Sequence, residues 1–461
     1  MNPQSNRILI NIHNTVGKTA YYYLSQKWLV VDPCSATMEL AVSSSFKSPP
    51  EKFSIPITDV IAVRSVYKKS QPDPKKFQVI YSKPSKKNVW RPRVLKFRHS
   101  DPDLVIQWVQ TMQSVLNKLV DRPKRILMFV NPYGGRKNGV KICENYARPL
   151  FEVAGVELTV VVTKRRNEIR DTLLEMDDLD KLDAVVCVGG DGTASEAFTG
   201  LVLRECRLRG INADDPGSTD TTSYCLHGTT DTITALLHII MGVSLGLDLT
   251  SVHYENRLLQ MCSNVVSYGF LGDIIYHSEK LRWMGPTRYE YVGAKKLLRN
   301  GGYKGTVTFL GHAINENETK CYENCNRCGS SEDHPSGVNK WSSISSNFFL
   351  LAGANISCAG TKNPHGLAPY CHLGDGYLNV LLVHHTSLYQ RLRTLQRMSQ
   401  STYSLADLPH VEVYRGKEFR FKADGAPGRW NCDGEPILDT DICVKVHRQL
   451  INVYSRGIPE S

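Results

Sequence analysis

The sequence predicts a multidomain α+β protein with an N-terminal β-barrel or sandwich, a central α/β lobe and a C-terminal antiparallel β-sandwich. Three observations lead to this prediction. Short strands followed by one amphipathic helix occupy residues 1–118, continuous apolar strands alternate with helices in residues 119–250, and strands with an alternating pattern fill residues 251–461. The length of 461 residues and the hydrophobic content of 41% allow three domains with sizeable cores.

The first domain is expected to be a small sheet closed by a C-terminal helix. Strands are predicted at 28–32, 77–81 and 94–98, and the helix at 102–118, where Asp101 can cap and Pro102 suits the first turn. One apolar stripe on this helix consists of Leu104, Val105, Trp108, Val109, Met112 and Leu116. Several strands closed by such a helix resemble a pleckstrin homology domain, with Trp108 at the central tryptophan position of that family.

Positive charge is concentrated in this first domain. Residues 1–118 hold 18 Lys and Arg against 7 Asp and Glu, an excess equal to the net charge of +11 of the whole chain. A basic module on a neutral body predicts attraction to an anionic surface, with a merely well-solvated surface as the alternative. Because no zinc-finger, recognition-helix or aromatic-platform pattern occurs here, an anionic membrane lipid such as a phosphoinositide is favoured over nucleic acid. The lysines expected to share one rim are Lys68, Lys69, Lys75, Lys76, Lys83, Lys86 and Lys87.

Hydropathy and cysteine usage predict a cytoplasmic protein without a membrane span. No uninterrupted apolar run of 18 residues occurs, and residues 1–14 are polar where a signal peptide would be apolar. The 13 cysteines are scattered along the chain, which indicates reduced thiols rather than disulfides.

The second domain is expected to contain a parallel sheet covered by helices. Its strands and helices follow a βαβαβα order at 126–130, 139–151, 156–163, 167–176, 184–188 and 194–206. Ligands of such sheets bind beyond the carboxyl ends of the strands. Two glycine turns lie at such ends, NPYGG at 131–135 and GGDGT at 189–193.

The GGDGT turn predicts a close approach of backbone to phosphate. Gly189, Gly190 and Gly192 lack the Cβ that would hold backbone N–H groups away from phosphate oxygens, and the helix that follows adds the positive end of its dipole. The carboxylate of Asp191 could take a proton from an attacking hydroxyl or orient Mg²⁺. An ordinary strand-to-helix turn is the alternative.

The third domain is expected to consist mainly of antiparallel strands. Strands are predicted at 258–266, 306–310, 348–352, 377–384, 411–422 and 442–454. Alternation such as Val411, Val413, Phe419 and Phe421 is typical of antiparallel sheets.

Five motifs in order resemble the diacylglycerol and sphingolipid kinase superfamily over about residues 124–455. They are NPYGG at 131–135, GGDGT at 189–193, GSTD at 217–220, GFLGD at 269–273 and WNCDGE at 430–435. Because NAD kinases and phosphofructokinases share GGDG, this motif alone cannot decide the substrate. The other four motifs favour a lipid kinase. The stretches SEKLRWMGPTRY, NISCAG, HLGDG and VEVYRGKEFRF, with CYENCNRC, resemble the ceramide kinase branch. This resemblance implies transfer of the ATP γ-phosphoryl group to the primary hydroxyl of ceramide, which gives ceramide 1-phosphate. Sphingosine or diacylglycerol is the alternative substrate.

The resemblance also implies roles for individual residues. Asp191 matches the catalytic acid and would be the general base. Asp273 would meet the lipid head group, with a structural turn aspartate as the alternative. The implied nucleotide site comprises Asn131, Gly134, Gly135, Thr163, Gly189, Gly190, Gly192, Thr193, Ser218, Thr219, Arg282, Arg288, Asp433 and Glu435. Surface salt bridging is the alternative for the two arginines, and exposed loop acids are the alternative for the last two carboxylates. Mg²⁺ would accompany ATP, Ca²⁺ is a candidate activator, and the Golgi or plasma membrane is the implied location of a peripheral enzyme.

Three cysteines, Cys321, Cys325 and Cys328, match a ceramide kinase signature that is needed for activity. A closed zinc site needs four ligands, so His334, His312 or Cys358 would have to complete this one through folding. Oxidation-sensitive thiols are the alternative to a metal site.

The chain departs from the superfamily pattern just before GSTD. Related kinases place an apolar strand there, whereas residues 209–216, RGINADDP, are short and polar and carry adjacent aspartates. We therefore keep a third hypothesis, a catalytically impaired membrane-binding or regulatory form that lacks this strand.

Overall fold

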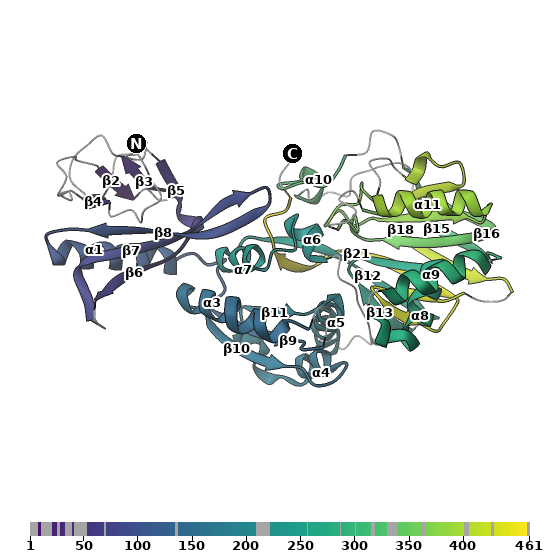
Figure 1. Ribbon diagram of the computed structural model, residues 1–461, viewed down its shortest axis with the longest axis horizontal. Coiled ribbons are helices and arrows are strands. Elements are labelled where there is room, and N and C mark those ends of the chain that lie inside the picture. The colour runs from purple at the N-terminus through teal and green to yellow at the C-terminus, as the bar shows by residue number, and fades with distance from the viewer. Residues whose placement is uncertain are drawn as a thin grey trace. The chain divides into compact units, whose positions relative to one another are not determined.

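The computed structural model describes residues 8–10, 21–24, 28–32, 39–40, 53–68, 71–133, 137–208, 222–255, 257–285, 287–299, 301–314, 319–329, 340–360, 366–400, 405–425 and 428–458 (Figure 1). The chain forms two compact units. Unit 1 comprises Met1–Ile126, Glu144–Leu158 and Asp231–Val243, and unit 2 comprises Leu127–Cys143, Thr159–Thr230 and Ser244–Ser461. None of the described helices is long and apolar enough to cross a bilayer.

Unit 1 begins with two antiparallel sheets, ordered β1-β2-β3-β5 and β4-β8-β7-β6. Their strands are β1 (Ile8–Ile10), β2 (Tyr21–Leu24), β3 (Trp28–Asp32), β4 (Glu39–Leu40), β5 (Phe53–Pro56), β6 (Val60–Lys68), β7 (Gln71–Lys86) and β8 (Val89–Arg98), with a 3₁₀ turn, η1 (Ile57–Asp59), between β5 and β6. The predicted helix is present as α1 (Pro102–Asn117). Asp101 caps it by accepting a hydrogen bond from Asp103 N at 2.9 Å.

The apolar stripe of α1 fills the core of this module. Val105, Trp108, Val109 and Met112 are buried. The Trp108 ring packs against Phe77, with ring centroids 6.2 Å apart, and Phe77 stacks on Phe97 at 4.8 Å. The stripe that the sequence predicts is therefore the face that covers the β6–β8 sheet.

The described lysines of the predicted basic rim do not lie together, and Lys69 is outside the described residues. The predicted strand 77–81 is only the middle of β7, which continues to Lys86 and therefore spans about 35 Å between Lys75 and Lys86. Lys75 and Lys76 lie near its start, where Lys76 pairs with Asp73 at 2.9 Å, while Lys86 and Lys87 lie at the turn into β8. The expectation of a single basic rim is wrong, because a long strand separates its two halves.

A helix from later in the sequence, α7 (Thr232–Met241), belongs to unit 1. Arg91 of β8 forms two hydrogen bonds with the carboxylate of Asp231, at 2.6 and 2.9 Å, while Asp231 caps α7 through Thr234 N. Trp90 N donates to the Thr234 hydroxyl at 3.0 Å, and the Trp90 ring meets His238 edge-on. The hairpin β7–β8 thus holds the start of a helix that follows it by about 140 residues.

The α/β lobe contains the predicted parallel sheet, in the order β10-β9-β11. Its strands are β9 (Arg125–Val130), β10 (Glu157–Val162) and β11 (Ala184–Val188), and its helices and turns are α2 (Gly139–Ile142), the π-helical η2 (Cys143–Ala147), α3 (Arg148–Ala154), α4 (Glu168–Glu175), η3 (Asp177–Lys181) and α5 (Asp191–Leu208). Backbone hydrogen bonds join the two strand starts, Glu157 N to Lys124 O, and the two strand ends, Thr163 N to Val130 O, so β9 and β10 run parallel. Residues 209–216, where the sequence lacks the expected strand, lie outside the described residues.

Helices α4 and α5 cover one face of this sheet in unit 2. Ile169 and Leu173 of α4 pack with Leu127 and Phe129 of β9 and with Ala197 of α5, and all five are buried. This apolar layer holds the carboxyl ends of the strands against the start of α5.

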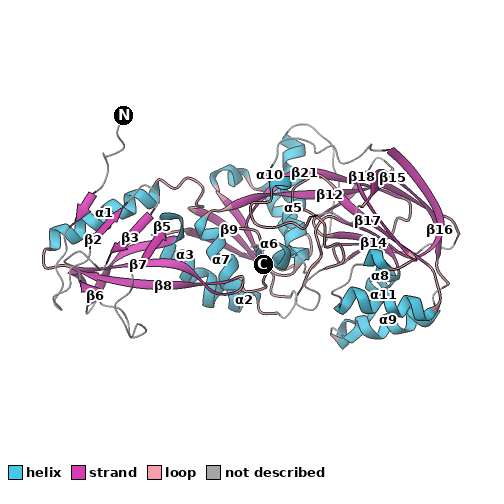
Figure 2. Ribbon diagram, turned by 90° about the horizontal axis from the view of Figure 1, so that it is seen from above, coloured by secondary structure: helices cyan, strands magenta, loops and turns pink. Residues whose placement is uncertain are grey.

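The third domain is a ten-stranded antiparallel sheet whose long strands fold it into two layers (Figure 2). Strands β16 and β18 each pair with β15 along one part and with β17 along another, so they continue from one layer into the other. The strands are β12 (Ser244–Tyr254), β13 (Arg257–Cys262), β14 (Val265–Gly269), β15 (Tyr303–Ala313), β16 (Lys340–Ala354), β17 (Leu378–His384), β18 (Val411–Ala423), β19 (Trp430–Cys432), β20 (Glu435–Ile437) and β21 (Ile442–Tyr454). Strand β12 crosses the expected boundary at residue 251.

Helices cover two regions of this antiparallel sheet. Phe270 of α8 (Phe270–Ser278) and Leu297 of α9 (Thr287–Arg299) pack on Phe349 and Leu381, with α11 (Leu388–Gln400) beside them. Elsewhere α6 (Thr222–His227) packs on β12 through Leu226. The remaining short elements are η4 (Glu279–Met284), α10 (Asn326–Gly329) and η5 (Leu405–Asp407).

Candidate functional site

The two glycine turns of the α/β lobe meet at the carboxyl ends of β9 and β11. Asn131 N donates to Val188 O at 2.8 Å, and the Asn131 side-chain amide donates to the Thr193 hydroxyl at 3.2 Å. A Cβ on Gly189 would lie 2.2 Å from that hydroxyl oxygen, so only glycine fits there. The sequence-predicted residues Asn131, Gly189 and Thr193 are therefore in one place.

Helix α5 begins at Asp191, directly after this turn. Thr193 N donates to Gly190 O at 2.9 Å, and Thr193 itself is buried. A helix that starts at the carboxyl end of a parallel strand points its free N–H groups and positive dipole end toward the ligand side of the sheet. This arrangement suits an anionic ligand beside Asp191.

Several predicted nucleotide residues lie beyond what the structure describes. Gly134, Gly135, Ser218 and Thr219 are outside the described residues, and the backbone alone is described for Asp191, Gly192 and Arg282. Thr163 lies at the end of β10, where its hydroxyl donates to Val130 O at 3.3 Å. It is buried next to the strand end that leads into Asn131.

The C-terminal DGE stretch reaches the α/β lobe through Glu435. Arg166, in the loop after β10, donates to a Glu435 carboxylate oxygen at 2.5 Å. Burial raises the pKa of Glu196 on α5, and the negative charge of Glu435 adds to this while Arg166 opposes it. The Glu435 carboxylate is therefore close enough to Glu196 of α5 to affect its pKa. Its partner Arg166 is about 270 residues away in the sequence.

The structure gives Asp433 a structural position that differs from the predicted nucleotide role. Its side chain is fully buried, and it accepts hydrogen bonds from the backbone N–H groups of Ser263, Asn264 and Val265 at 2.7 to 3.3 Å. The Cys262 thiol donates to it at 3.0 Å. A carboxylate enclosed by the turn before β14 cannot also present its oxygens to a nucleotide.

Asp273 lies in the first turn of α8, within the antiparallel lobe. It is 6% exposed, and one carboxylate oxygen accepts from Lys296 Nζ at 2.6 Å and from the Tyr303 hydroxyl at 2.9 Å. A Cβ on Gly272 would lie 1.9 Å from Arg429 O, so the glycine of GFLGD lets this helix start close to the neighbouring chain. The motif thus fixes a buried carboxylate beside an ammonium and a phenol.

Arg288 of α9 is paired within its own region. Its guanidinium donates to the Tyr289 hydroxyl at 2.6 Å and lies 3.7 Å from a Glu279 carboxylate oxygen. This is the salt bridging that the sequence left open as the alternative for Arg288.

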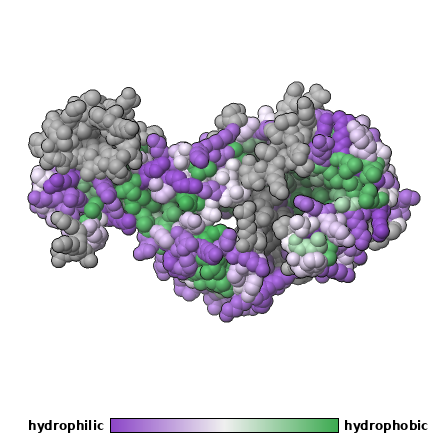
Figure 3. Space-filling model, viewed as in Figure 1, coloured by the Kyte–Doolittle hydropathy of each residue, from purple (hydrophilic) through white to green (hydrophobic). Residues whose placement is uncertain are grey.

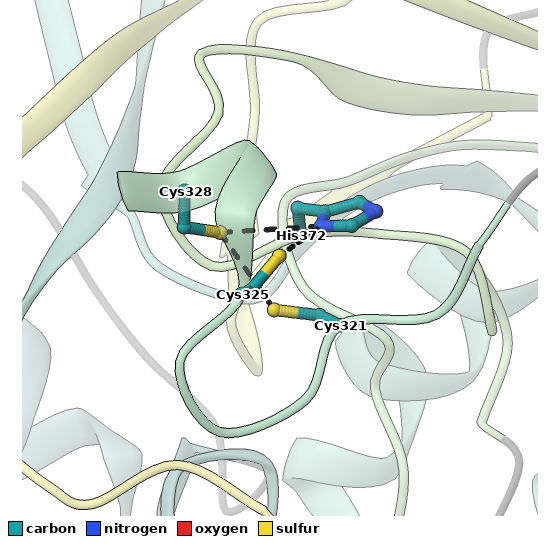
Figure 4. A group of neighbouring side chains, drawn as sticks. All are labelled: Cys321, Cys325, Cys328 and His372. Atoms are coloured by element: carbon teal, nitrogen blue, oxygen red, sulfur yellow. Dashed lines mark hydrogen bonds between the residues drawn. The ribbon is translucent and has the colours of Figure 1, made fainter. Parts of the chain in front are cut away.

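The three signature cysteines converge with a histidine that the sequence did not single out (Figure 4). The sulfur and nitrogen atoms of Cys321, Cys325, Cys328 and His372 all lie within 4.8 Å of one another. Of the three residues expected to complete a site, His334 is outside the described residues. His312 packs near Tyr377, and Cys358 donates to Ile356 O.

Comparison with known proteins agrees with this fold and these motifs. The diacylglycerol kinase catalytic domain matches residues 125–252, and the ceramide kinase C-terminal domain matches residues 265–429. The chain is 33% identical to human "Ceramide kinase" over 482 residues, which covers 88% of this chain and 89% of the human one. It is also 33% identical to the Mus musculus "Ceramide kinase" over 435 residues, which covers 80% and 82%.

A solved structure shows the same fold. The putative diacylglycerol kinase from Bacillus anthracis str. Sterne aligns with a TM-score of 0.52 at 15% identity, over 74% of this chain and 97% of that one. The two matched domains and the identity over most of the chain lead to one assignment. The chain belongs to the ceramide kinase family of ATP-dependent lipid kinases.

Proposed function

We propose that this enzyme transfers the γ-phosphoryl group of ATP to the primary hydroxyl of ceramide, which gives ceramide 1-phosphate and ADP. The observation that carries the nucleotide part is the contact between Asn131 and Thr193, which joins two glycine turns at the carboxyl ends of β9 and β11. The names and similarity of the curated relatives support ceramide as the acceptor.

In the proposed reaction, Asp191 accepts the proton of the ceramide hydroxyl. The hydroxyl oxygen forms a bond to the γ-phosphorus while the bond to the bridging oxygen breaks, and ADP leaves with that electron pair. The start of α5 and the glycine backbone would bind phosphate oxygens, and Arg282 would stabilise charge on the transferred group. Mg²⁺ would enter with ATP and neutralise phosphate charge. Arg166 holds the Glu435 carboxylate at the α/β lobe, where this carboxylate would be a ligand for the ion.

The lipid end is proposed to lie at Asp273. One carboxylate oxygen already accepts from Lys296 and Tyr303, which fixes the side chain, and the carboxylate has further lone pairs for the hydroxyl or amide N–H of a lipid head group. The proposed role is orientation of ceramide rather than proton transfer.

Membrane association is part of this proposal, because ceramide resides in bilayers. The sequence places a basic, pleckstrin homology-like module in front of the catalytic lobes, and an anionic lipid such as a phosphoinositide is its proposed ligand.

Unit 2 exposes three large side chains on neighbouring helices. Trp283 of η4 is 81% exposed, Tyr389 of α11 is 73% exposed and Leu298 of α9 is 72% exposed. Helix α9 contacts both η4 and α11. Exposed aromatic and aliphatic side chains of this kind suit the interface of a bilayer, so we propose a cytoplasmic enzyme that docks peripherally, at the Golgi or plasma membrane. The face drawn in Figure 3 also carries apolar patches, in green, among polar residues in purple.

The deciding experiment offers the purified full chain ceramide, sphingosine and diacylglycerol in identical vesicles with γ-labelled ATP. We expect label in ceramide and much less in the other two lipids. Label in sphingosine or diacylglycerol with none in ceramide would replace ceramide by that lipid and leave the kinase assignment standing.

The polar segment 209–216 supports the rival proposal of an impaired membrane-binding form. In the same assay, that form would label none of the three lipids while still binding vesicles. A variant with an apolar strand restored before Gly217 tests whether the polar segment weakens ATP binding. Much tighter ATP binding by the restored chain would support the impaired form, and equal binding would contradict it.

A further inference from the structure

The side chains of Cys321, Cys325, Cys328 and His372 form a cluster with the ligand set of a structural zinc site. The three cysteines come from the segment 319–329 between β15 and β16, and His372 comes from the loop before β17 (Figure 4). His372 is buried, and the three cysteines are half-buried. Three thiols and one imidazole are one of the combinations that hold Zn²⁺ in closed tetrahedral sites.

The distances fit four ligands around one ion. With Zn–S about 2.3 Å and Zn–N about 2.05 Å, tetrahedral geometry places two sulfurs about 3.8 Å apart and a sulfur and a nitrogen about 3.6 Å apart. Cys321 Sγ and Cys328 Sγ are 3.7 Å apart, and His372 Nδ1 lies 3.2 Å from Cys325 Sγ and 3.9 Å from Cys328 Sγ. A disulfide would need sulfurs about 2.05 Å apart, and the three cysteines are free thiols.

The surroundings of the histidine select the nitrogen that faces the sulfurs. His372 Nε2 lies 3.1 Å from Thr319 O, and because a carbonyl oxygen can only accept, Nε2 carries the proton. Nδ1 is the ring nitrogen that faces the cysteine sulfurs and would bind the metal. A second hydrogen bond of this kind, from the far ring nitrogen to a backbone carbonyl, is how proteins orient metal-binding histidines.

The backbone between the cysteines turns so that the three sulfurs face one another. Gly329 N donates to Cys325 O at 2.9 Å, which closes the short helix α10 that carries Cys328. Asn324 adopts a left-handed conformation, with φ of 57°, which turns the chain between Cys321 and Cys325. These turns bring the three sulfurs and His372 together, with the four ligand atoms within 4.8 Å of one another.

The same segment is fixed at its other side to the C-terminal strand. Gln449 of β21 donates from Nε2 to Cys328 O at 2.7 Å, and Glu323 N donates to Ile458 O at 2.7 Å. An ion at the cluster would therefore connect three stretches of unit 2 that are distant in sequence: the β15–β16 connection, the loop before β17 and the region of β21.

We propose that Cys321, Cys325, Cys328 and His372 bind one Zn²⁺ ion in a closed tetrahedral site. The ion holds the β15–β16 connection on the antiparallel lobe, and it has no open coordination position for a substrate. Its binding free energy contributes to folding of this connection. The site is independent of the proposed lipid substrate, so a different substrate would leave it standing.

The test measures the metal content of the full chain, purified without metal-affinity resin, by elemental mass spectrometry. We expect about one zinc ion per chain. Cys325→Ser and His372→Ala should lose the metal, and His372→Cys should keep it, because Cys₄ sites also bind zinc. Cys358→Ser and Cys371→Ser are matched controls, since these neighbouring thiols donate to backbone carbonyls instead, and both should retain zinc.

A second measurement keeps the proposal testable if the ligand variants do not fold. Wild-type protein produced in cobalt-supplemented, zinc-depleted medium should show the visible bands of tetrahedral Co²⁺ and the near-ultraviolet charge transfer of cobalt–thiolate bonds. Folded wild-type protein without stoichiometric metal and without these bands would overturn the proposal. A Cys321–Cys328 disulfide found by peptide mapping of that protein would replace the zinc site with a redox pair. Equal zinc loss from Cys358→Ser would contradict the ligand assignment.

Discussion

The side-chain amide of Asn131 donates a hydrogen bond to the Thr193 hydroxyl over 3.2 Å, and this contact joins the ends of two parallel strands. We expect Asn131→Ala to raise KM for ATP by roughly fivefold, because loss of about 1 kcal/mol of hydrogen bonding loosens the turn that binds phosphate. Steady-state kinetics with varied ATP at saturating lipid measure this. Thr172→Ala, which removes a hydroxyl bonded within α4, should leave KM unchanged. An equal rise in both variants would contradict a local role for Asn131.

Replacing the proposed base should abolish turnover without unfolding the chain. Asp191→Asn keeps the size of the side chain at the start of α5 but cannot accept the hydroxyl proton. We expect kcat to fall about 10²- to 10⁴-fold, with little change in thermal unfolding. Single-turnover labelling and calorimetry of the same preparation report both quantities. A kcat within a few-fold of wild type would remove Asp191 from proton transfer.

The contact between Arg166 and Glu435 predicts coupled effects on nucleotide binding. Arg166→Ala and Glu435→Ala should each raise KM for ATP, and the double variant should be no worse than either one, because both break the same ion pair. The exchanged pair Arg166→Glu with Glu435→Arg should recover part of the loss. Since Arg166 is largely exposed, the free energy of unfolding should change by less than about 1 kcal/mol. Additive effects on KM would show that the two residues act independently.

Burial of His227 predicts that the protein loses stability in mild acid. Burial lowers the pKa of this histidine to about 4, whereas in the unfolded chain it is about 6.5. Between these pH values the unfolded chain binds the proton and the folded chain does not, so the free energy of unfolding falls as pH drops from about 6.5 to about 4. Chemical denaturation across this range should show a shallower slope for His227→Gln than for wild type. The half-buried His385→Gln is the control. An unchanged slope in His227→Gln would show that other titratable groups determine the pH dependence of the free energy of unfolding.

The two lysine clusters of the N-terminal module should contribute separately to vesicle binding. They lie at opposite ends of β7, so one flat membrane surface need not contact both. Lys75→Glu with Lys76→Glu, and Lys86→Glu with Lys87→Glu, should weaken binding to vesicles that contain an anionic lipid to different extents, most clearly at low salt. Vesicle sedimentation measures this, with neutral vesicles as the control. Unchanged binding in both variants would discredit the membrane role of these lysines.

The sequence predicted the elements whose signals are local. Helix α1 begins at Pro102 with Asp101 as its cap, and β11 occupies Ala184–Val188, because caps and short apolar runs act within a few residues. The full length of β7 was missed because Pro72, Pro74 and Pro84 are typical of strand ends, yet this strand includes them.

The sequence predicted those site residues whose position follows from one motif and the strand before it. Asn131 and Thr193 meet because both follow strands of one parallel sheet. His372 was missed as the fourth member of the cysteine cluster, because 44 residues separate it from Cys328 and only the β-lobe brings them together. The burial of Asp433 was also unpredictable, since a DGE stretch gives no sign of the backbone turn that encloses its carboxylate.

The Arg91–Asp231 contact ties the N-terminal module to α7, so this module cannot be removed without affecting α7. A truncation that removes residues 1–118 would leave the Asp231 carboxylate without its guanidinium and expose a helix in which Leu236, Leu237, Ile240 and Met241 are buried. An apolar helix face released into water promotes aggregation. The basic module is therefore more than a targeting tag, because its strands β6 and β8 contact α7 directly.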